Sequence, residues 1–158
     1  MRIMVFGAGS RMMGDERAGI AVLEELSRTT LPHNVTLRET GTDGYGLLTD
    51  LEDADLAIVV DCAKMGLEPG SVVVFGPEEV EDRLPDKTIS LHSISLLRVI
   101  QLAQQLGYTT RIRIVGIEPA RVEPSDELSE PVAQAVPRAV RCVLEEIRRA
   151  LDDAQGDC

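Results

Sequence analysis

The sequence predicts an α/β fold: a single three-layer α/β/α sandwich with a mostly parallel, twisted sheet of about five strands flanked by helices. Short apolar segments alternate along the whole chain with longer segments in which apolar residues recur at helical spacing. The segment Leu56–Asp61 opens with five consecutive apolar residues, which is typical of a central parallel strand buried on both faces. No internal repeat or low-complexity linker interrupts the 158 residues, a length that suits one domain.

The first half of the chain is expected to hold three strands separated by two helices. Apolar runs predict the strands Arg2–Phe6, Val35–Glu39 and Leu56–Asp61. After a glycine-containing loop, Asp15 is expected to be the N-cap of the first helix, with Glu16 in its first turn and an apolar stripe ending near Thr30. A shorter helix is expected over Gly46–Leu51.

The second half is expected to add two strands and two long helices. In chain order its segments are a strand at Ser71–Phe75, an acidic connector at Gly76–Lys87, a helix at Ile94–Leu106 closed by Gly107, a strand at Arg111–Gly116, a polar loop at Glu118–Pro131 and a helix from Val132 to about Leu151. Alternating basic and apolar residues predict that the last strand is an edge or half-exposed strand. Residues 1–151 thus form the domain, and 152–158 are expected to be a frayed tail.

The charge balance argues against two classes of partner. The chain carries 16 Lys and Arg against 27 Asp and Glu, a formal net charge of −11, which disfavours binding to nucleic acid or to an anionic membrane surface. The longest uncharged run, Val99–Thr110, is far shorter than the roughly 20 apolar residues of a membrane span, and the start lacks the apolar stretch of a signal peptide. We therefore expect a soluble, cytoplasmic domain.

Three polar residues are expected to meet at one edge of the sheet. Glu16 follows the first strand, Asp61 ends the central strand and His92 opens the helix after the connector, so all three project toward the carboxyl ends of the strands. Two carboxylates and one imidazole from separate segments can form a metal site with open positions. Each residue also has an ordinary explanation, as a helix-dipole acid, a loop cap or a partly buried helix-start residue, and geometry alone leaves the choice open.

Few other residues offer catalytic chemistry. His33 lies in a Pro-containing turn and is expected to be solvated, which leaves His92 as the credible base. Cys62 follows an acid and lacks an electropositive setting, so a buried structural cysteine is favoured over a nucleophile. The three cysteines are odd in number and widely spaced, which supports neither a disulfide framework nor a thiolate zinc site.

A second interpretation starts from Gly7 and Gly9, with Glu39 at the end of the second strand, where a ribose-binding acid would sit. The dinucleotide-binding motif needs a third Gly where this chain has Met12, and the helix starts too late to hold a pyrophosphate at Gly7. A tight turn explains the two glycines as well. A nucleotide-binding regulatory module of the Rossmann type remains an alternative.

The order of motifs along the chain resembles a known family. The segment Gly7–Gly19, GAGSRMMGDERAG, is similar to the opening motif of the nickel–iron hydrogenase maturation endopeptidases, roughly G-x-G-N-x-L-x-x-D-(D/E)-x-x-G. Ser10 and Met12 stand where that motif usually has Asn and Leu. The resemblance continues in collinear order over nearly the whole chain, at Gly41–Gly44, the strand ending in Asp61, Ser90–Ser95, Val115–Pro119 and Val122–Pro124.

This resemblance implies an endopeptidase that removes a short C-terminal extension from its partner, the hydrogenase large-subunit precursor, after nickel has been inserted. The family's metal-binding acid, acid and histidine fall on Glu16, Asp61 and His92, which would serve catalysis and metal binding together. Nickel held by the precursor, or another divalent metal, would activate a water or polarise the scissile carbonyl. The free protein is expected to be a monomer. A non-catalytic, metal-binding maturation chaperone of the same fold is a further alternative.

Two pairs of residues are weaker candidates. Glu39 and Asp43 flank the turn at Gly41 and are candidates for shaping a substrate cleft, although turn-forming, solvated acids are at least as common there. Arg111 and Arg113 are candidates for docking an acidic partner surface, against the default of a solvated strand face.

Overall fold

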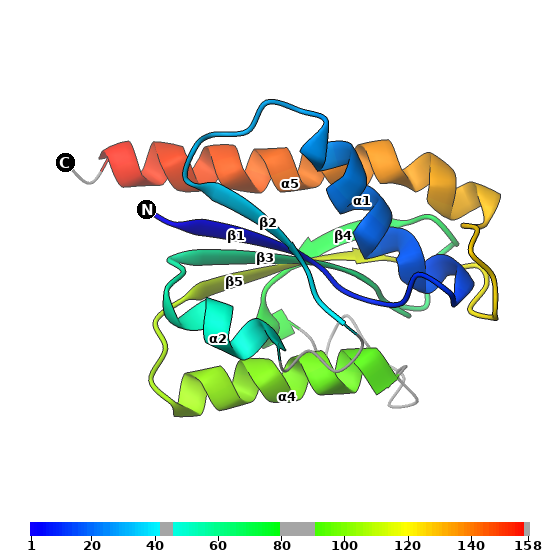
Figure 1. Cartoon of the computed structure of the whole chain (residues 1–158), viewed down its shortest axis with the longest axis horizontal. Helices are drawn as coiled ribbons and strands as arrows, with labels where there is room; N and C mark the ends of the chain where they lie inside the picture. The colour runs from blue at the N-terminus through cyan, green and yellow to red at the C-terminus, as the bar shows by residue number, and fades with distance from the viewer. Residues whose placement is uncertain (42–45, 80–90, 157–158) are drawn as a thin grey trace.

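The computed structural model describes residues 1–41, 46–79 and 91–156, with side chains in the last range described from residue 98 onward. Its strands form one five-stranded sheet in the order β2-β1-β3-β5-β4 (Figure 1). All neighbouring strands are parallel except β4, which runs antiparallel to β5. The strands are β1 Ile3–Gly7, β2 Val35–Glu39, β3 Leu56–Cys62, β4 Val72–Phe75 and β5 Arg111–Ile117. The predicted mostly parallel sheet is confirmed.

Helices cover both faces of this sheet, as the three-layer prediction requires (Figure 1). Helices α1 and α5 lie on one face, and α2 and α4 lie on the other. Their bounds are α1 Ala18–Ser27, α2 Gly46–Glu52, α4 Leu91–Gln105 and α5 Glu130–Gly156, with short 3-10 helices η1 at Gly14–Arg17 and η2 at Pro77–Glu79. Among the described residues, no helix has both the length and the apolar character needed to cross a bilayer.

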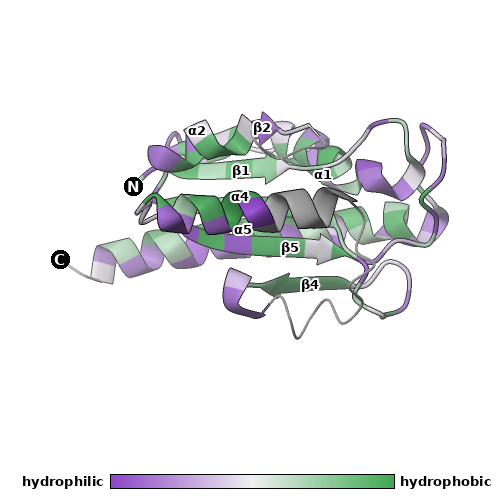
Figure 2. Cartoon of the chain, turned by 90° about the horizontal axis from the view of Figure 1, so that it is seen from below, coloured by the Kyte–Doolittle hydropathy of each residue, from purple (hydrophilic) through white to green (hydrophobic). Residues whose placement is uncertain are grey.

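The strands divide their side chains between two cores. In β1, Ile3 and Val5 face α1 and α5, whereas Met4 and Phe6 join the core under α2 and α4, because successive side chains point to opposite faces. All residues of β3 are buried, which confirms the central strand predicted from its unbroken apolar run. Figure 2 shows β1, β5 and β4 as largely hydrophobic, while the helices carry hydrophilic residues as well.

The position of β5 differs from the prediction. It was expected at an edge or half-exposed, but it lies between β3 and β4, and the edges are β2 and β4. The basic residues that made it look exposed are near its start, where Arg113 lies 3.4 Å from the carboxylate of Glu146 on α5. A strand can therefore alternate basic and apolar residues and still be internal when the covering helix supplies an acid.

Two helix boundaries also differ. The first helix begins at Ala18 and not beside Asp15, which lies in the preceding turn η1. The last helix continues to Gly156, so residues 152–156 are helical where a frayed tail was expected. An ion pair between Arg148 and Asp152, 2.8 Å apart at i,i+4 spacing, stabilises this last part of α5.

The strand order fixes where a ligand can bind. Strand β2 lies on one side of β1, and β3 lies on the other. The chain that leaves β1 and the chain that leaves β3 therefore run in opposite directions along the sheet. Open parallel sheets bind ligands in the crevice that forms at such a point. We call the residues that follow β1, β3 and β5 at this end (8–16, 61–70 and 118–131) the rim.

Candidate active site

Glu16 reaches the rim through close packing of the chain after β1. Gly9 has φ of 121°, and a side chain there would collide with the carbonyl oxygen of Glu16. A Cβ on Gly19 would likewise collide with the carbonyl oxygen of Val60 in β3. The glycines therefore let η1 and the start of α1 lie directly on the strand ends. Glu16 is held there with only 6% of its surface exposed.

Asp61 lies beside this turn at the end of β3. The amide of Ala8 donates to the carbonyl of Val60 over 2.9 Å, and Gly7 of β1 pairs with Val60 in the strand register. Asp61 is the next residue and is 4% exposed. The structure thus brings the two predicted acids, Glu16 and Asp61, to the same part of the rim.

His92, the third member of the predicted site, is the second residue of α4. Its side chain lies outside the described part of the structure, so its meeting with the two acids stays a prediction. Within the described residues, no group of three His, Cys, Asp or Glu side chains has the arrangement of a metal site.

Asp15 has a role that the sequence analysis missed. It was predicted to cap the first helix, but its fully buried carboxylate accepts hydrogen bonds from the amides of Ala120 (2.8 Å), Arg121 (2.7 Å) and Ser129 (2.8 Å). The hydroxyl of Ser129 donates a fourth bond, at 2.8 Å. Asp15 therefore clamps the loop after β5 onto the turn that carries Glu16. The sequence signal for this role was the pair of adjacent acids, Asp15 and Glu16, in the opening motif. The motif does not show which of the two acids is structural.

Glu118 was also missed as a structural acid of the rim. Its Oε1 accepts hydrogen bonds from the amides of Met65 (2.8 Å) and Leu67 (2.7 Å), and its backbone carbonyl accepts one from Gly70 (2.8 Å). These bonds fix the loop that follows Asp61. Two buried acids thus hold the backbone on either side of the predicted catalytic pair.

Cys62 is surrounded by these acids and is buried. Burial raises the pKa of its thiol, and the negative charges of Asp61, Glu16, Asp15 and Glu118 raise it further. A thiol in this setting stays protonated at neutral pH and is a poor nucleophile, in agreement with the structural role predicted for it. His33 is exposed in a turn, as predicted.

The glycine-based nucleotide alternative finds no support in this geometry. The space beside Gly9 that a phosphate would need is filled by the backbone of Glu16. Glu39, the expected ribose ligand, instead accepts two hydrogen bonds from the guanidinium of Arg11, at 2.9 and 2.8 Å. Asp43, the other weak candidate, lies outside the described residues.

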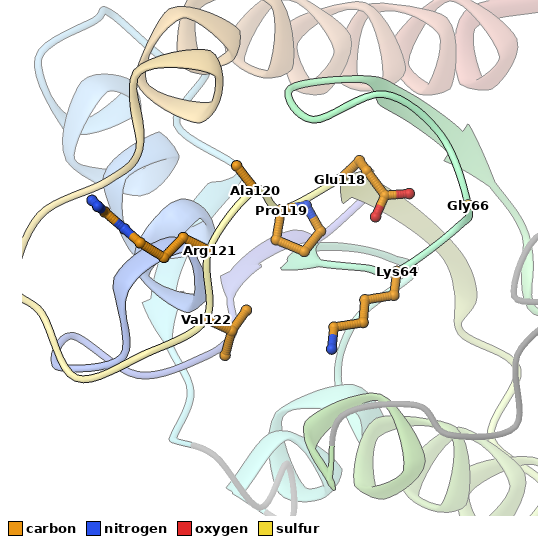
Figure 3. A pocket seen from close by; sticks show the side chains of 7 residues that line it. All are labelled: Lys64, Gly66, Glu118, Pro119, Ala120, Arg121 and Val122. Atoms are coloured by element: carbon orange, nitrogen blue, oxygen red, sulfur yellow. The ribbon is translucent and has the colours of Figure 1, made fainter.

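A pocket of about 360 Å³ opens at the rim. It lies between the loop after β3 and the loop after β5 (Figure 3). The lining residues are Lys64, Gly66, Glu118, Pro119, Ala120, Arg121 and Val122. Two nearly buried carboxylates at the strand ends and a hollow in the same rim are features that can bind and polarise a substrate.

Comparisons with known proteins agree on one family. A model of the hydrogenase maturation protease family matches residues 20–146. The chain is 31% identical over 153 residues to the hydrogenase 2 maturation protease of Escherichia coli, covering 95% of this chain and 93% of that protein. It is 33% identical over 150 residues to the hydrogenase expression/formation protein HupD of Rhodobacter capsulatus, covering 93% of this chain and 71% of that protein.

Solved structures show the same likeness. The hydrogenase maturating endopeptidase HybD from E. coli superimposes with a TM-score of 0.86 at 29% identity, covering 95% of this chain and 94% of that one. The [NiFe] hydrogenase maturation protease HybD from Thermococcus kodakarensis gives 0.76 at 25% identity, covering 92% and 98%. In each case nearly the whole of both chains takes part.

Proposed function

The chain belongs to the hydrogenase maturation protease family, and from this premise we propose that it is an endopeptidase for the large-subunit precursor of a nickel–iron hydrogenase. Its action is to remove the C-terminal extension of the precursor after nickel has been inserted. The proposal is supported by relatives named as maturation proteases or endopeptidases that match over nearly their full length. The observation in the structure that supports it most is that Glu16 and Asp61 are both nearly buried at the rim, where the turn after β1 packs on the end of β3.

We propose Glu16, Asp61 and His92 as the site that meets the nickel carried by the precursor. The donor set suits such an ion, because carboxylate oxygen and imidazole nitrogen both ligate divalent nickel. Two nearly buried carboxylates at the end of a strand favour the binding of a cation there. Nickel, or another divalent metal in its place, would supply Lewis acidity toward the scissile bond.

The chain's own residues would act on the peptide and the attacking water. Hydrolysis adds water to the scissile carbonyl carbon, breaks the carbon–nitrogen bond and moves a proton to the departing amine. A nearly buried carboxylate can take the proton of the attacking water and return it to the amine. Glu16 or Asp61 would do this, and Asp15 and Glu118 support the proposal by fixing the neighbouring backbone through loop amides.

The test compares Glu16→Gln, Asp61→Asn and His92→Ala with the wild type on nickel-loaded precursor, followed by intact mass. Each change should reduce cleavage by at least about 100-fold, because it removes a group that touches the reacting atoms or the metal. Glu146→Gln is the matched control, since this buried acid lies on α5 away from the rim and should leave cleavage intact. Full processing of the precursor by His92→Ala would show that His92 does not belong to the site. Binding of the precursor without a change in its mass would instead indicate a non-catalytic chaperone.

We further propose that the protein acts in the cytoplasm and is a monomer when free. Cell fractionation and light scattering on a sizing column test these two statements independently of cleavage.

A further inference from the structure

Lys64 differs from the other cations of the rim in having no acidic partner among the described residues. It is exposed in the loop after β3 and lines the rim pocket. The nearby arginines are paired: Arg11 with Glu39 at 2.8 Å and with Glu24 at 3.1 Å, Arg17 with Glu24 at 3.5 Å, and Arg121 with Glu123 at 3.3 Å. The pocket therefore has one positive charge available to a ligand.

The other lining side chains that face the pocket are apolar or already have hydrogen-bond partners. Pro119 and Val122 supply its apolar wall, and the Glu118 carboxylate is committed to the amides of the opposite loop. Figure 3 shows the Lys64 side chain reaching across the opening toward Val122, whereas Arg121 points away. The pocket thus combines an aliphatic wall with an ammonium group at its mouth.

The surroundings make that ammonium group decisive for an acidic ligand. Asp15, Glu16, Asp61 and Glu118 are all buried in the rim, so a carboxylate that binds there needs a cation beside it. Among the described residues that line the pocket, Lys64 is the cation without an acidic partner. Lys64 is three residues after Asp61, and three residues span at most about 11 Å. An extended substrate covers that distance in about three to four residues.

We propose that the rim pocket is a subsite in which Lys64 binds a carboxylate of the precursor's C-terminal extension, with the adjoining aliphatic part against Pro119 and Val122. This inference rests on the proposed function and adds a specificity determinant to it. By holding one acidic group a few residues from the scissile bond, Lys64 strengthens the binding of extensions that carry an acid at that place.

The test uses Lys64→Met beside Arg28→Met, since each removes one positive charge and Arg28 is exposed just after the end of α1 that lies away from the rim. The readouts are KM and kcat for precursor cleavage. For Lys64→Met we expect KM to rise about three- to tenfold with kcat changed less than about twofold, because removing an exposed, charge-assisted hydrogen bond weakens the binding of the ground state and the transition state alike. Arg28→Met should change neither constant.

Two altered precursors identify the source of the carboxylate. In one, the acidic side chains of the extension are replaced by amides; in the other, its C-terminal carboxylate is amidated. The precursor that lacks the bound group should show a raised KM with the wild type and no further rise with Lys64→Met. When the bound group is a side chain, the KM of Lys64→Glu should return toward the wild-type value on a precursor that carries Lys at the position of that side chain.

Three results overturn the subsite. The first is a KM for Lys64→Met equal to that for Arg28→Met, and the second is a loss confined to kcat. The third is that Lys64→Met raises KM on both altered precursors by the same factor as on the unaltered precursor. In all three the wild type still cleaves the precursor, so the proposed function stands. Failure of the wild type to cleave nickel-loaded precursor would overturn the proposed function itself, and the subsite with it.

Discussion

Buried carboxylates occur in two regions of this protein, and the two regions hold them differently. At the rim, Asp15 and Glu118 accept hydrogen bonds from backbone amides of loops distant in sequence. Between α5 and β5, Glu146 lies 3.4 Å from the guanidinium of Arg113, whose buried Nε has no hydrogen-bond partner in the described part of the chain.

The difference teaches what each acid contributes. An acid bonded to amides fixes a backbone, and at the rim that backbone carries Glu16 on one side and follows Asp61 on the other. An acid paired with a guanidinium fixes only a side chain. Its burial costs desolvation free energy, which an imperfect contact with the guanidinium offsets only in part. We therefore expect the rim acids to be indispensable and the α5 pair to be replaceable.

The largest effect is expected at Asp15. Replacing Asp15 by Ala leaves three amides and a hydroxyl without their acceptor, which should cost at least about 3 kcal/mol of the free energy of unfolding. Urea denaturation measures this loss. Asp153→Ala, which removes an exposed acid on α5, is the control and should change stability by less than about 0.5 kcal/mol. Equal losses for the two variants would contradict the clamp.

A pair of changes at Glu118 sharpens the comparison. A single oxygen, Oε1, accepts both amide bonds, so Glu118→Gln can keep them through its amide oxygen. We expect Glu118→Gln to cost less than about 1 kcal/mol and Glu118→Ala about 2–3 kcal/mol in thermal or urea unfolding. Similar losses for both would show that the charge, and not the hydrogen bonding, holds the loop.

In the other region a double replacement should be tolerated. Arg113→Met alone leaves Glu146 buried without its partner and should cost about 2 kcal/mol or more. Arg113→Met combined with Glu146→Leu should be near neutral, because apolar side chains of similar size avoid the desolvation cost. A double-mutant cycle by urea denaturation checks this. A double variant that is less stable than Arg113→Met would place the α5 pair in the same class as the rim acids.

The smallest effect concerns pH and Cys62. Burial and the four nearby acids raise the pKa of its thiol in the folded protein above the ordinary value of 9.0, so the native state holds the proton that the unfolded state releases. The contribution of this thiol to the free energy of unfolding is therefore fully present below pH 9 and is lost as the pH rises above it. The free energy of unfolding falls there by at most about 1.4 kcal/mol per pH unit. Unfolding measured from pH 8 to 10 should show a shallower slope for Cys62→Ala than for the wild type. An unchanged slope in Cys62→Ala would contradict the expectation.

Part of the site followed from local sequence. The placement of Glu16 and Asp61 at the same sheet edge came from one rule, that parallel strands end together, and the structure agrees. The role of Asp15 could not be found this way, because its partners lie 105 to 114 residues further along the chain. Lys64 was not singled out either, since a lone lysine gains meaning only from the pocket and the paired arginines around it.

By itself the sequence determined the alternation of strands and helices, the buried central strand, the glycines of the opening motif and the family resemblance. These properties depend on residue spacing and on local backbone conformation, which short segments encode. Only the tertiary structure decided that β5 is internal, that the tail from Asp152 continues α5, and that Asp15 and Glu118 bind the rim loops together. The physical reason is that the environment of a polar side chain is set by its spatial partners, and those arrive from elements far away in the sequence.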